Sequence, residues 1–195
     1  TAYSDGSGSP AVSTGQGDGI DLKAGLQDVT VRGNRISRGW VDGVVKAPGV
    51  GNSSSGISSD GVFAGAIGRY TVENNIIDQY TKGMNLGVLQ HITIRNNLVY
   101  DNYYQGIGFT GDVGYTSSDI KIYNNTAHGN GDVGIGIGYS DLVDVRNNLV
   151  FGNDVLNQNS GLQANAQGST NVTSDYNVYG PIGPYENMNE GIHTT

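Results

Sequence analysis

A short apolar alternation, a paired Asn or Gly-Asn and a second apolar run recur along this chain. The five clearest copies are VTVRGNRI (29–36), YTVENNII (70–77), ITIRNNLV (92–99), IKIYNNTA (120–127) and VDVRNNLV (143–150), and VTSDYNVY (172–179) is a weaker sixth. The second Asn lies at positions 34, 75, 97, 125, 148 and 177, so successive copies are 41, 22, 28, 23 and 29 residues apart. This period, built from β-branched alternation, predicts a β-solenoid.

Residues 92–119 illustrate one coil. Ile92 and Ile94 point inward, the Asn pair forms a tight corner, a second short strand follows, and a third begins at Gly106. Three strands per coil predict an all-β, right-handed parallel β-helix of about six coils, in which equivalent Asn side chains stack as an internal ladder. The third strand is marked by a Gly-Ile element, which recurs at Gly19-Ile20, Gly83-Met84, Gly134-Ile135, Gly161-Leu162 and, by the same pattern, Gly43-Val44.

Composition fits many short strands joined by tight turns. The 195 residues include 32 Gly, and only 36% are hydrophobic; Gly and Asn tolerate the left-handed backbone that such turns need. We expect one domain over residues 1–180, followed by an irregular tail or the start of a further coil over 181–195. The chain has no Cys and no apolar run long enough to cross a bilayer. A secreted or cell-surface bacterial protein fits this composition, and the oligomeric state stays open.

The formal charge of −8 bears on possible partners. Nucleic acid is a poor candidate, because its phosphate backbone requires a basic face. The same charge opposes an anionic polysaccharide unless cations mediate the contact.

The longest gap in the repeat indicates where loops and a site could lie. Residues 48–68 form a Gly/Ser-rich excursion directly after the expected strand 43–49, and such insertions usually build a binding surface. On the same expected sheet, Asp18, Asp21 and Lys23 project outward, with Lys46 one coil further on. Carboxylates beside a lysine could form a cation site next to a general base, or an exposed row of salt bridges.

The chain resembles the pectate-lyase-like β-helices, most closely family 9 of the polysaccharide lyases. IKIYNNTAHGNG (120–131) is similar to that family's repeat, GDGIDLK (17–23) to its calcium motif, and DGVVKAPG (42–49) to the segment that carries its catalytic lysine. This resemblance implies that Asp18 and Asp21 are Ca²⁺ ligands and that Lys46 is the base.

A second resemblance is to family 6 of the polysaccharide lyases. GIDLKAGLQDVTVRGN (19–34) has the layout of that family's site, which implies that Lys23 is the base and that Lys46 replaces the family's arginine. Both resemblances imply an acidic polysaccharide as partner, cleaved by Ca²⁺-assisted β-elimination. The family 9 resemblance implies a pectate-like uronic-acid polymer, and the family 6 resemblance implies alginate or a chondroitin-type chain. The bound Ca²⁺ would neutralise the substrate carboxylate, which answers the charge objection.

Other polar and aromatic residues complete the expectations. The candidate substrate-binding residues are Arg38, Tyr103, Tyr104, Tyr115 and Tyr139. His91 and His128 are interpreted as solvated residues of corners or turns. The alternative function is a non-catalytic carbohydrate-binding or adhesive surface module, because this kind of scaffold hosts both enzymes and binding proteins.

Overall fold

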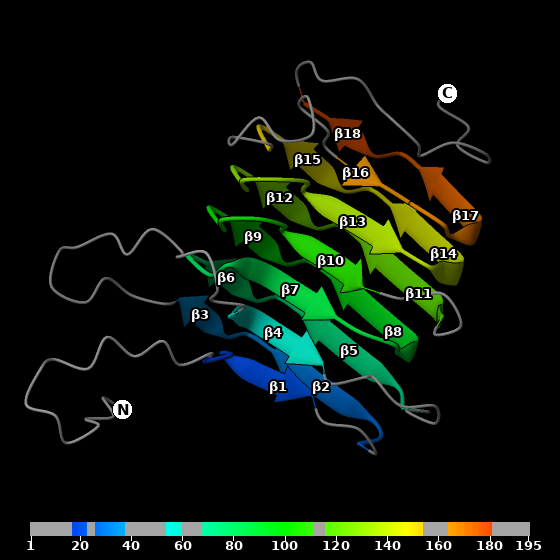
Figure 1. The fold of residues 1–195 in the computed structure, drawn as a ribbon, viewed down its shortest axis with the longest axis horizontal. Coiled ribbons are helices and arrows are strands. Elements are labelled where there is room, and N and C mark those ends of the chain that lie inside the picture. Colours follow the sequence, from blue (N-terminus) through cyan, green and yellow to red (C-terminus); the bar gives the residue numbers. More distant parts are fainter. Residues whose placement is uncertain are drawn as a thin grey trace, which may run out of the picture.

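The computed structural model describes residues 17–22, 26–37, 54–59, 68–110, 116–153 and 164–180, and these form three parallel sheets of six strands each (Figure 1). Sheet A contains β1 (Ile20–Leu22), β4 (Ser55–Ser59), β7 (Lys82–Leu86), β10 (Ile107–Thr110), β13 (Ile135–Gly138) and β16 (Ala164–Asn165). Sheet B contains β2 (Val29–Arg32), β5 (Tyr70–Glu73), β8 (Gln90–Arg95), β11 (Ser117–Tyr123), β14 (Ser140–Arg146) and β17 (Thr170–Asp175). Sheet C contains β3 (Arg35–Ser37), β6 (Ile76–Asp78), β9 (Leu98–Tyr100), β12 (Thr126–His128), β15 (Leu149–Phe151) and β18 (Val178–Tyr179).

The chain visits sheets A, B and C in turn, and each strand pairs with its equivalent one coil away. The structure therefore confirms the right-handed parallel β-helix with three strands per coil. No helix among the described residues is long and apolar enough to span a membrane. The boundary expected at residue 180 stays a prediction, since residues 181–195 lie outside the described part.

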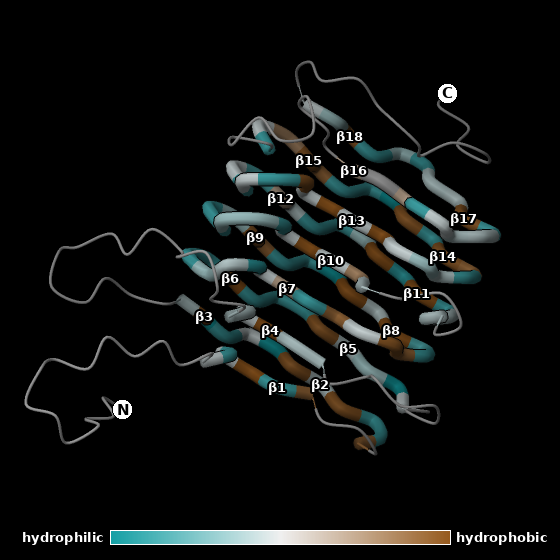
Figure 2. The backbone as a smooth tube through the Cα atoms, viewed as in Figure 1, coloured by the Kyte–Doolittle hydropathy of each residue, from teal (hydrophilic) through white to brown (hydrophobic). Residues whose placement is uncertain are grey.

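Inward side chains form continuous columns because the register is in phase from coil to coil. In sheet B, Val72 pairs with Ile94 and Ile94 with Ile122, and all three are fully buried. Figure 2 shows the corresponding apolar segments repeating from coil to coil. Full burial of one such side chain contributes about 1.5–3 kcal/mol, and columns from all three sheets make up the core.

A column of Asn amides, buried in its four middle members, runs along the corner between sheets B and C, as the sequence predicts. The backbone N–H and the Nδ2 of Asn75 both donate to Oδ1 of Asn97 at 3.0 Å, and Nδ2 of Asn97 donates to the carbonyl oxygen of Val72 at 2.9 Å. The same contacts recur along the column of Asn34, Asn75, Asn97, Asn125, Asn148 and Asn177. The residue before each Asn has φ between 54° and 70°, which explains why Asn or Gly usually stands there.

A second Asn column, which the sequence analysis did not identify, occupies the corner between sheets C and A. Asn102 donates from its backbone and its side chain to Oδ1 of Asn130, and Asn130 does the same to Asn153, at 2.8–3.2 Å. One coil earlier, the backbone N–H of Tyr80 donates to Oδ1 of Asn102 at 3.1 Å. This column is shorter than the first, and its members lack the repeated Asn pair that marks the other corner.

The pairing of strands in sheet A corrects one strand assignment. The strand next to β1 is β4, in which Ile57 pairs with Ile20, so the prediction that residues 43–49 supply this strand is wrong. β4 has the sequence SGISS, and its serines at 55 and 58 are buried. This segment was interpreted as a loop because it lacks apolar alternation.

The Gly-Ile element of the sheet A strands accounts for two further details. The equivalent of Ile57 in the last coil is Ala164, which pairs with Ile135, whereas Leu162 lies outside the described residues. The element requires glycine because successive coils approach closely at the start of the sheet A strands. A Cβ on Gly106 would lie 2.6 Å from the carbonyl oxygen of Gly134.

Replacing one Asn of the first column tests its contribution to stability. Asn97→Ala leaves the donors of Asn75 and the carbonyl of Val72 without partners, so we expect the free energy of unfolding to fall by roughly 2–4 kcal/mol. Urea denaturation measures this change. The matched control is Asn96→Gly, at an exposed position with φ 56°, where we expect little change. Equal losses in both variants would contradict the role of the column.

Candidate functional site

The two predicted metal ligands lie at the start of sheet A and share one wall, as expected. Oδ1 of Asp18 accepts from the backbone N–H of Ser55, and its Oδ2 accepts from Oγ of Ser58, both at 2.7 Å. Oγ of Ser58 also lies 3.4 Å from Oδ1 of Asp21. Both oxygens of Asp18 therefore hold β4 against β1. The described residues contain no group of three or more His, Asp or Glu side chains suited to a metal ion, so ligation by Asp18 and Asp21 stays a prediction.

The predicted bases and two of the predicted substrate-binding residues lie outside the described residues: Lys23, Lys46, Arg38 and Tyr115. Because β4 occupies the place next to β1, the strand assignment that was to bring Lys46 beside Asp21 does not hold. The catalytic roles of Lys46 and Lys23 stay predictions.

A lysine that the sequence analysis did not single out lies on sheet A. Lys82 begins β7, pairs in register with Ser55, and donates from Nζ to Oδ1 of Asn85 at 3.1 Å. Burial lowers the pKa of Lys82, and the charge of Asp132 opposes that shift. Its position directly before the Gly83-Met84 element is the sequence signal that could have placed it on this sheet.

Three of the predicted substrate-binding tyrosines flank sheet A, but at opposite ends of its strands. Tyr103 and Tyr104 lie between β9 and β10 with ring centroids 4.7 Å apart in an edge-to-face arrangement. Tyr139 lies between β13 and β14, where a Cβ on Gly168 would come within 2.9 Å of its ring. All three are half-buried and lie several coils from Asp18. The structure therefore does not bring them together with the carboxylates.

The two described histidines lie in strands, so their interpretation as turn residues is wrong, although the side chain of His91 is exposed as expected. His128 lies in β12 between the rings of Tyr100 and Phe151, with centroids 5.3 and 5.1 Å apart and nearly parallel planes. His91 lies in β8, and its Nδ1 is 2.8 Å from Oδ2 of Asp119 in β11. The parallel register brings these residues together from neighbouring coils. Their separation in the sequence does not reveal the contacts.

Sheet B presents paired charges on its outer face. Glu73 lies between two guanidinium groups, 2.6 Å from Arg95 and 3.8 Å from Arg32. Besides the His91–Asp119 contact, three further ion pairs lie on this sheet or directly before its strands: Arg69–Asp28, Lys121–Asp119 and Arg146–Asp144, at 2.6–2.7 Å. Five of the ten Lys and Arg residues of the chain thus lie on this face.

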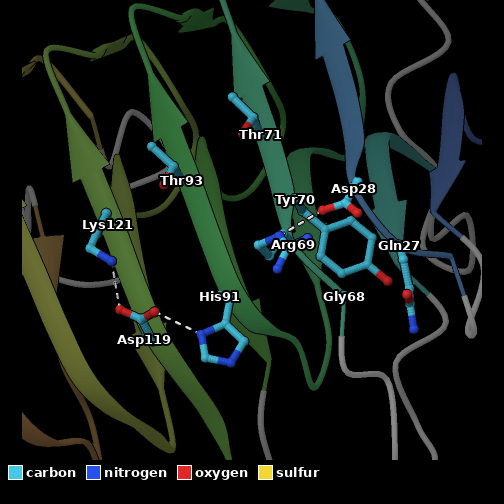
Figure 3. Close-up of a pocket in the computed structure, with 10 residues that line it drawn as sticks. All are labelled: Gln27, Asp28, Gly68, Arg69, Tyr70, Thr71, His91, Thr93, Asp119 and Lys121. Carbon is cyan, nitrogen blue, oxygen red and sulfur yellow. Dashed lines mark hydrogen bonds and ion pairs between the residues drawn. The ribbon is translucent and has the colours of Figure 1, made fainter.

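A hollow of about 510 Å³ lies over the first coils of this face (Figure 3). Arg69 and Asp28 stand on one side of it, and the chain of His91, Asp119 and Lys121 stands on the other. The remaining lining residues come from the strands β5 and β8 and from the corners before β2 and β5: Gln27, Gly68, Tyr70, Thr71 and Thr93. We call this site the sheet-B hollow.

Asp119 links the charges on one side of the hollow. Its Oδ1 accepts from Nζ of Lys121 at 2.7 Å, and its Oδ2 contacts Nδ1 of His91. Hydrogen bonds, from Lys121 first and then from His91, hold the pKa of the Asp119 carboxyl below its ordinary value. Asp119 therefore stays ionised and fixes the orientation of the imidazole.

The fold places the protein in the class of right-handed parallel β-helices with polar outer faces. Residues 5–180 match the family model described as periplasmic copper-binding protein (NosD), and the chain belongs to this family. The match agrees with the β-helix resemblance but does not support the pectate-lyase-like family. No curated protein and no solved structure gives a significant match.

The ion pairs of Asp119 predict a specific dependence of stability on pH. A carboxyl whose pKa is lower in the folded state contributes stability above its unfolded pKa, about 3.9, and loses it as the pH falls through the folded pKa. We expect Asp119→Asn to reduce the free energy of unfolding by less than about 1 kcal/mol at neutral pH, because the site is partly solvated.

The same substitution should then lose its effect in acid. We expect the wild-type and Asp119→Asn curves to approach each other as the pH falls below about 3.9, and to meet once the pH lies below the lowered pKa of Asp119 in the folded state. Urea denaturation over a pH series measures the difference, and Asn is compatible with the φ of 54° at this position. A gap that stays constant across the series would show that the carboxylate charge does not matter.

Proposed function

We propose that this protein is a non-catalytic module of the NosD family that works outside the bacterial cytoplasm and binds an acidic polysaccharide along sheet B. The description of the family as periplasmic supports the location. The extended outer face of a solenoid supports binding of a long polymer, since equivalent positions repeat about every 4.8 Å.

The local charge of sheet B is the observation that carries this proposal. The segments 27–32, 68–73, 90–95 and 117–123 contain Arg32, Arg69, Arg95 and Lys121 against Asp28, Glu73 and Asp119, so four positive and three negative charges leave +1. The whole chain carries −8. An anionic polymer therefore meets less repulsion at this end of sheet B, which contains the hollow, than the net charge of the whole chain suggests.

The use of the carboxylates supports binding without catalysis. Asp18 holds β4 by two hydrogen bonds, Glu73 lies between two guanidinium groups, and both oxygens of Asp119 have partners. These groups stabilise the fold and the face. Ca²⁺-assisted β-elimination by Lys46 or Lys23 remains the competing function, and it predicts a product that binding alone does not give.

Copper binding, which the family description states, does not fit the described residues. Copper sites in proteins use His, Cys and Met ligands. The chain has no Cys, and Met84 is fully buried in the core. The two described histidines lie on different sheets. One ring nitrogen of His91 already contacts Asp119, and both ring faces of His128 are stacked against other rings. We therefore derive no copper chemistry from this part of the chain.

Binding without turnover can be tested directly with polygalacturonate, alginate and chondroitin. We expect calorimetry to show binding that weakens with added salt, with no rise in the ultraviolet absorbance of unsaturated uronides, with or without Ca²⁺. Arg95→Gln removes one charge from sheet B and should weaken binding roughly two- to fivefold. Lys82→Gln, the matched control on sheet A, should leave binding unchanged. Unsaturated product would instead support the lyase, and Lys46→Ala and Lys23→Ala would then identify its base.

The effect of added metal ions on the unfolding temperature tests whether the chain holds a metal site. Because no suitable donor cluster lies among the described residues, we expect Cu²⁺ and Ca²⁺ to leave the unfolding temperature of the purified chain almost unchanged. Differential scanning calorimetry with each ion, and with EDTA as reference, measures this. A shift of several degrees with Cu²⁺ would place copper ligands outside the described residues, and a shift with Ca²⁺ that Asp18→Asn removes would support the predicted calcium site.

A further inference from the structure

We propose that the sheet-B hollow is a subsite for the carboxylate of a uronic-acid residue, and that Arg69 and protonated His91 are the groups that recognise it. This inference rests on the proposed function and adds the chemistry and the pH dependence of one contact. No bound ligand is needed to state it, because the hydrogen-bonding capacity left over in the hollow is specific.

The hollow has spare donors, whereas most of its acceptors are occupied. Nε of Arg69 donates to Oδ1 of Asp28 at 2.6 Å, and both oxygens of Asp119 are engaged by His91 and Lys121. In the described part of the chain, the terminal nitrogens of Arg69, Nε2 of His91 and the remaining N–H groups of Lys121 have no further partner. Their side chains are 76%, 50% and 43% exposed, so a ligand can reach them.

Arg69 and His91 are placed to act on one group. Tyr70 pairs with Ile92 in register, so the residues directly before them are equivalent positions on consecutive coils, about 4.8 Å apart along the solenoid. A carboxylate accepts two hydrogen bonds from an arginine and a further one from a neighbouring donor. The hydroxyls of Thr71 and Thr93 line the same hollow and can bond the hydroxyl groups of the sugar ring.

The bond to Asp119 decides what His91 offers the ligand. Since a carboxylate only accepts, Nδ1 of His91 carries the proton in this contact. In the neutral imidazole, Nε2 is then an acceptor, and its lone pair repels a carboxylate. Protonation converts Nε2 into a donor and adds a positive charge to the hollow, so carboxylate binding favours protonated His91.

No other group that faces the hollow changes charge in the same pH range. The other charged side chains that line the hollow are Arg69, Lys121, Asp28 and Asp119, and arginine, lysine and aspartate ordinarily titrate outside the range from about pH 5 to 8. The pKa of Asp119 is held down by Lys121 and His91. Tyr70 donates its hydroxyl to the carbonyl oxygen of Leu26, and burial raises the pKa of Tyr70, so it stays neutral. The charge of the hollow therefore rises by one when His91 is protonated.

The probe for this subsite is tetragalacturonate, measured by calorimetry with the full chain at about pH 5.5 and about pH 8, where uronate carboxyl groups are ionised. We expect binding about three- to tenfold tighter at the lower pH, from one charge-assisted hydrogen bond at a partly solvated site. Arg69→Gln should weaken binding at both pH values. His91→Asn should remove the pH dependence, and Asn suits the φ of 56° at this position.

The control is Lys82→Gln, which removes one positive charge from sheet A, outside both the hollow and the proposed binding face. We expect its binding and pH dependence to equal those of the wild type. The methyl-esterified tetramer should bind more weakly and without pH dependence. Circular dichroism of each variant establishes that it is folded.

Two results separate this inference from the proposed function. If polygalacturonate binds sheet B but His91→Asn keeps the pH dependence of the wild type, the subsite is wrong and the module remains. If neither the polymers nor tetragalacturonate bind, both proposals are overturned. A change in the imidazole ¹⁵N shifts of His91 on adding tetragalacturonate, absent in Arg69→Gln, would support the subsite independently.

Discussion

The whole structure depends on keeping successive coils in one register, and the Asn column between sheets B and C is the interaction that fixes it. Each step of this column satisfies a buried amide by bonding it to the next coil and to a strand carbonyl. A slipped coil would leave these polar groups unpaired in an apolar interior, which is costly. All six corners between sheets B and C accordingly contain two residues, from Gly33-Asn34 to Tyr176-Asn177. The variation in repeat length, from 22 to 41 residues, therefore lies outside this corner, in the other two corners and in the strands of sheets A and B.

The same register determines the chemistry of the outer faces. Residues far apart in the sequence become neighbours at equivalent positions, so Glu73 meets Arg32 and Arg95, and His91 meets Asp119. Because most of these contacts join one coil to the next, the charged rows contribute to coil stacking as well as to any ligand. Exposed ion pairs of this kind add little stability each. Their larger effect is on function: carboxylates occupied by neighbouring cations leave mainly donors facing the solvent.

The sequence was sufficient for the fold and for the first Asn column, since both follow from a repeated pattern of inward apolar residues and paired Asn. It was insufficient where a strand lacks that pattern. β4 contains buried serines in place of alternating apolar residues, so its segment was interpreted as a loop and the neighbouring strand was assigned to residues 43–49. The ion pairs of sheet B were missed for another reason. His91 and Asp119 are 28 residues apart, and only the exact lengths of the intervening corners place them on adjacent coils. Asp18 and Asp21 were predicted to share a wall because Asp18 lies at the entry to the short strand that contains Asp21, where the local sequence is enough.

Scaffold and surface are chemically separate in this protein, and that separation bears on what family membership implies. The inward apolar columns and the buried Asn amides specify the solenoid, and they lie in the interior and not on the outer faces. Outward residues can therefore change without affecting the register, so members of one β-helix family can share the coil and differ in what they bind. The described outer faces of this chain carry guanidinium, ammonium, hydroxyl and carboxylate groups, which suit sugars and their acidic groups better than they suit copper. The family match accordingly identifies the scaffold, and the free donors of the sheet-B hollow are the basis of the ligand that we propose.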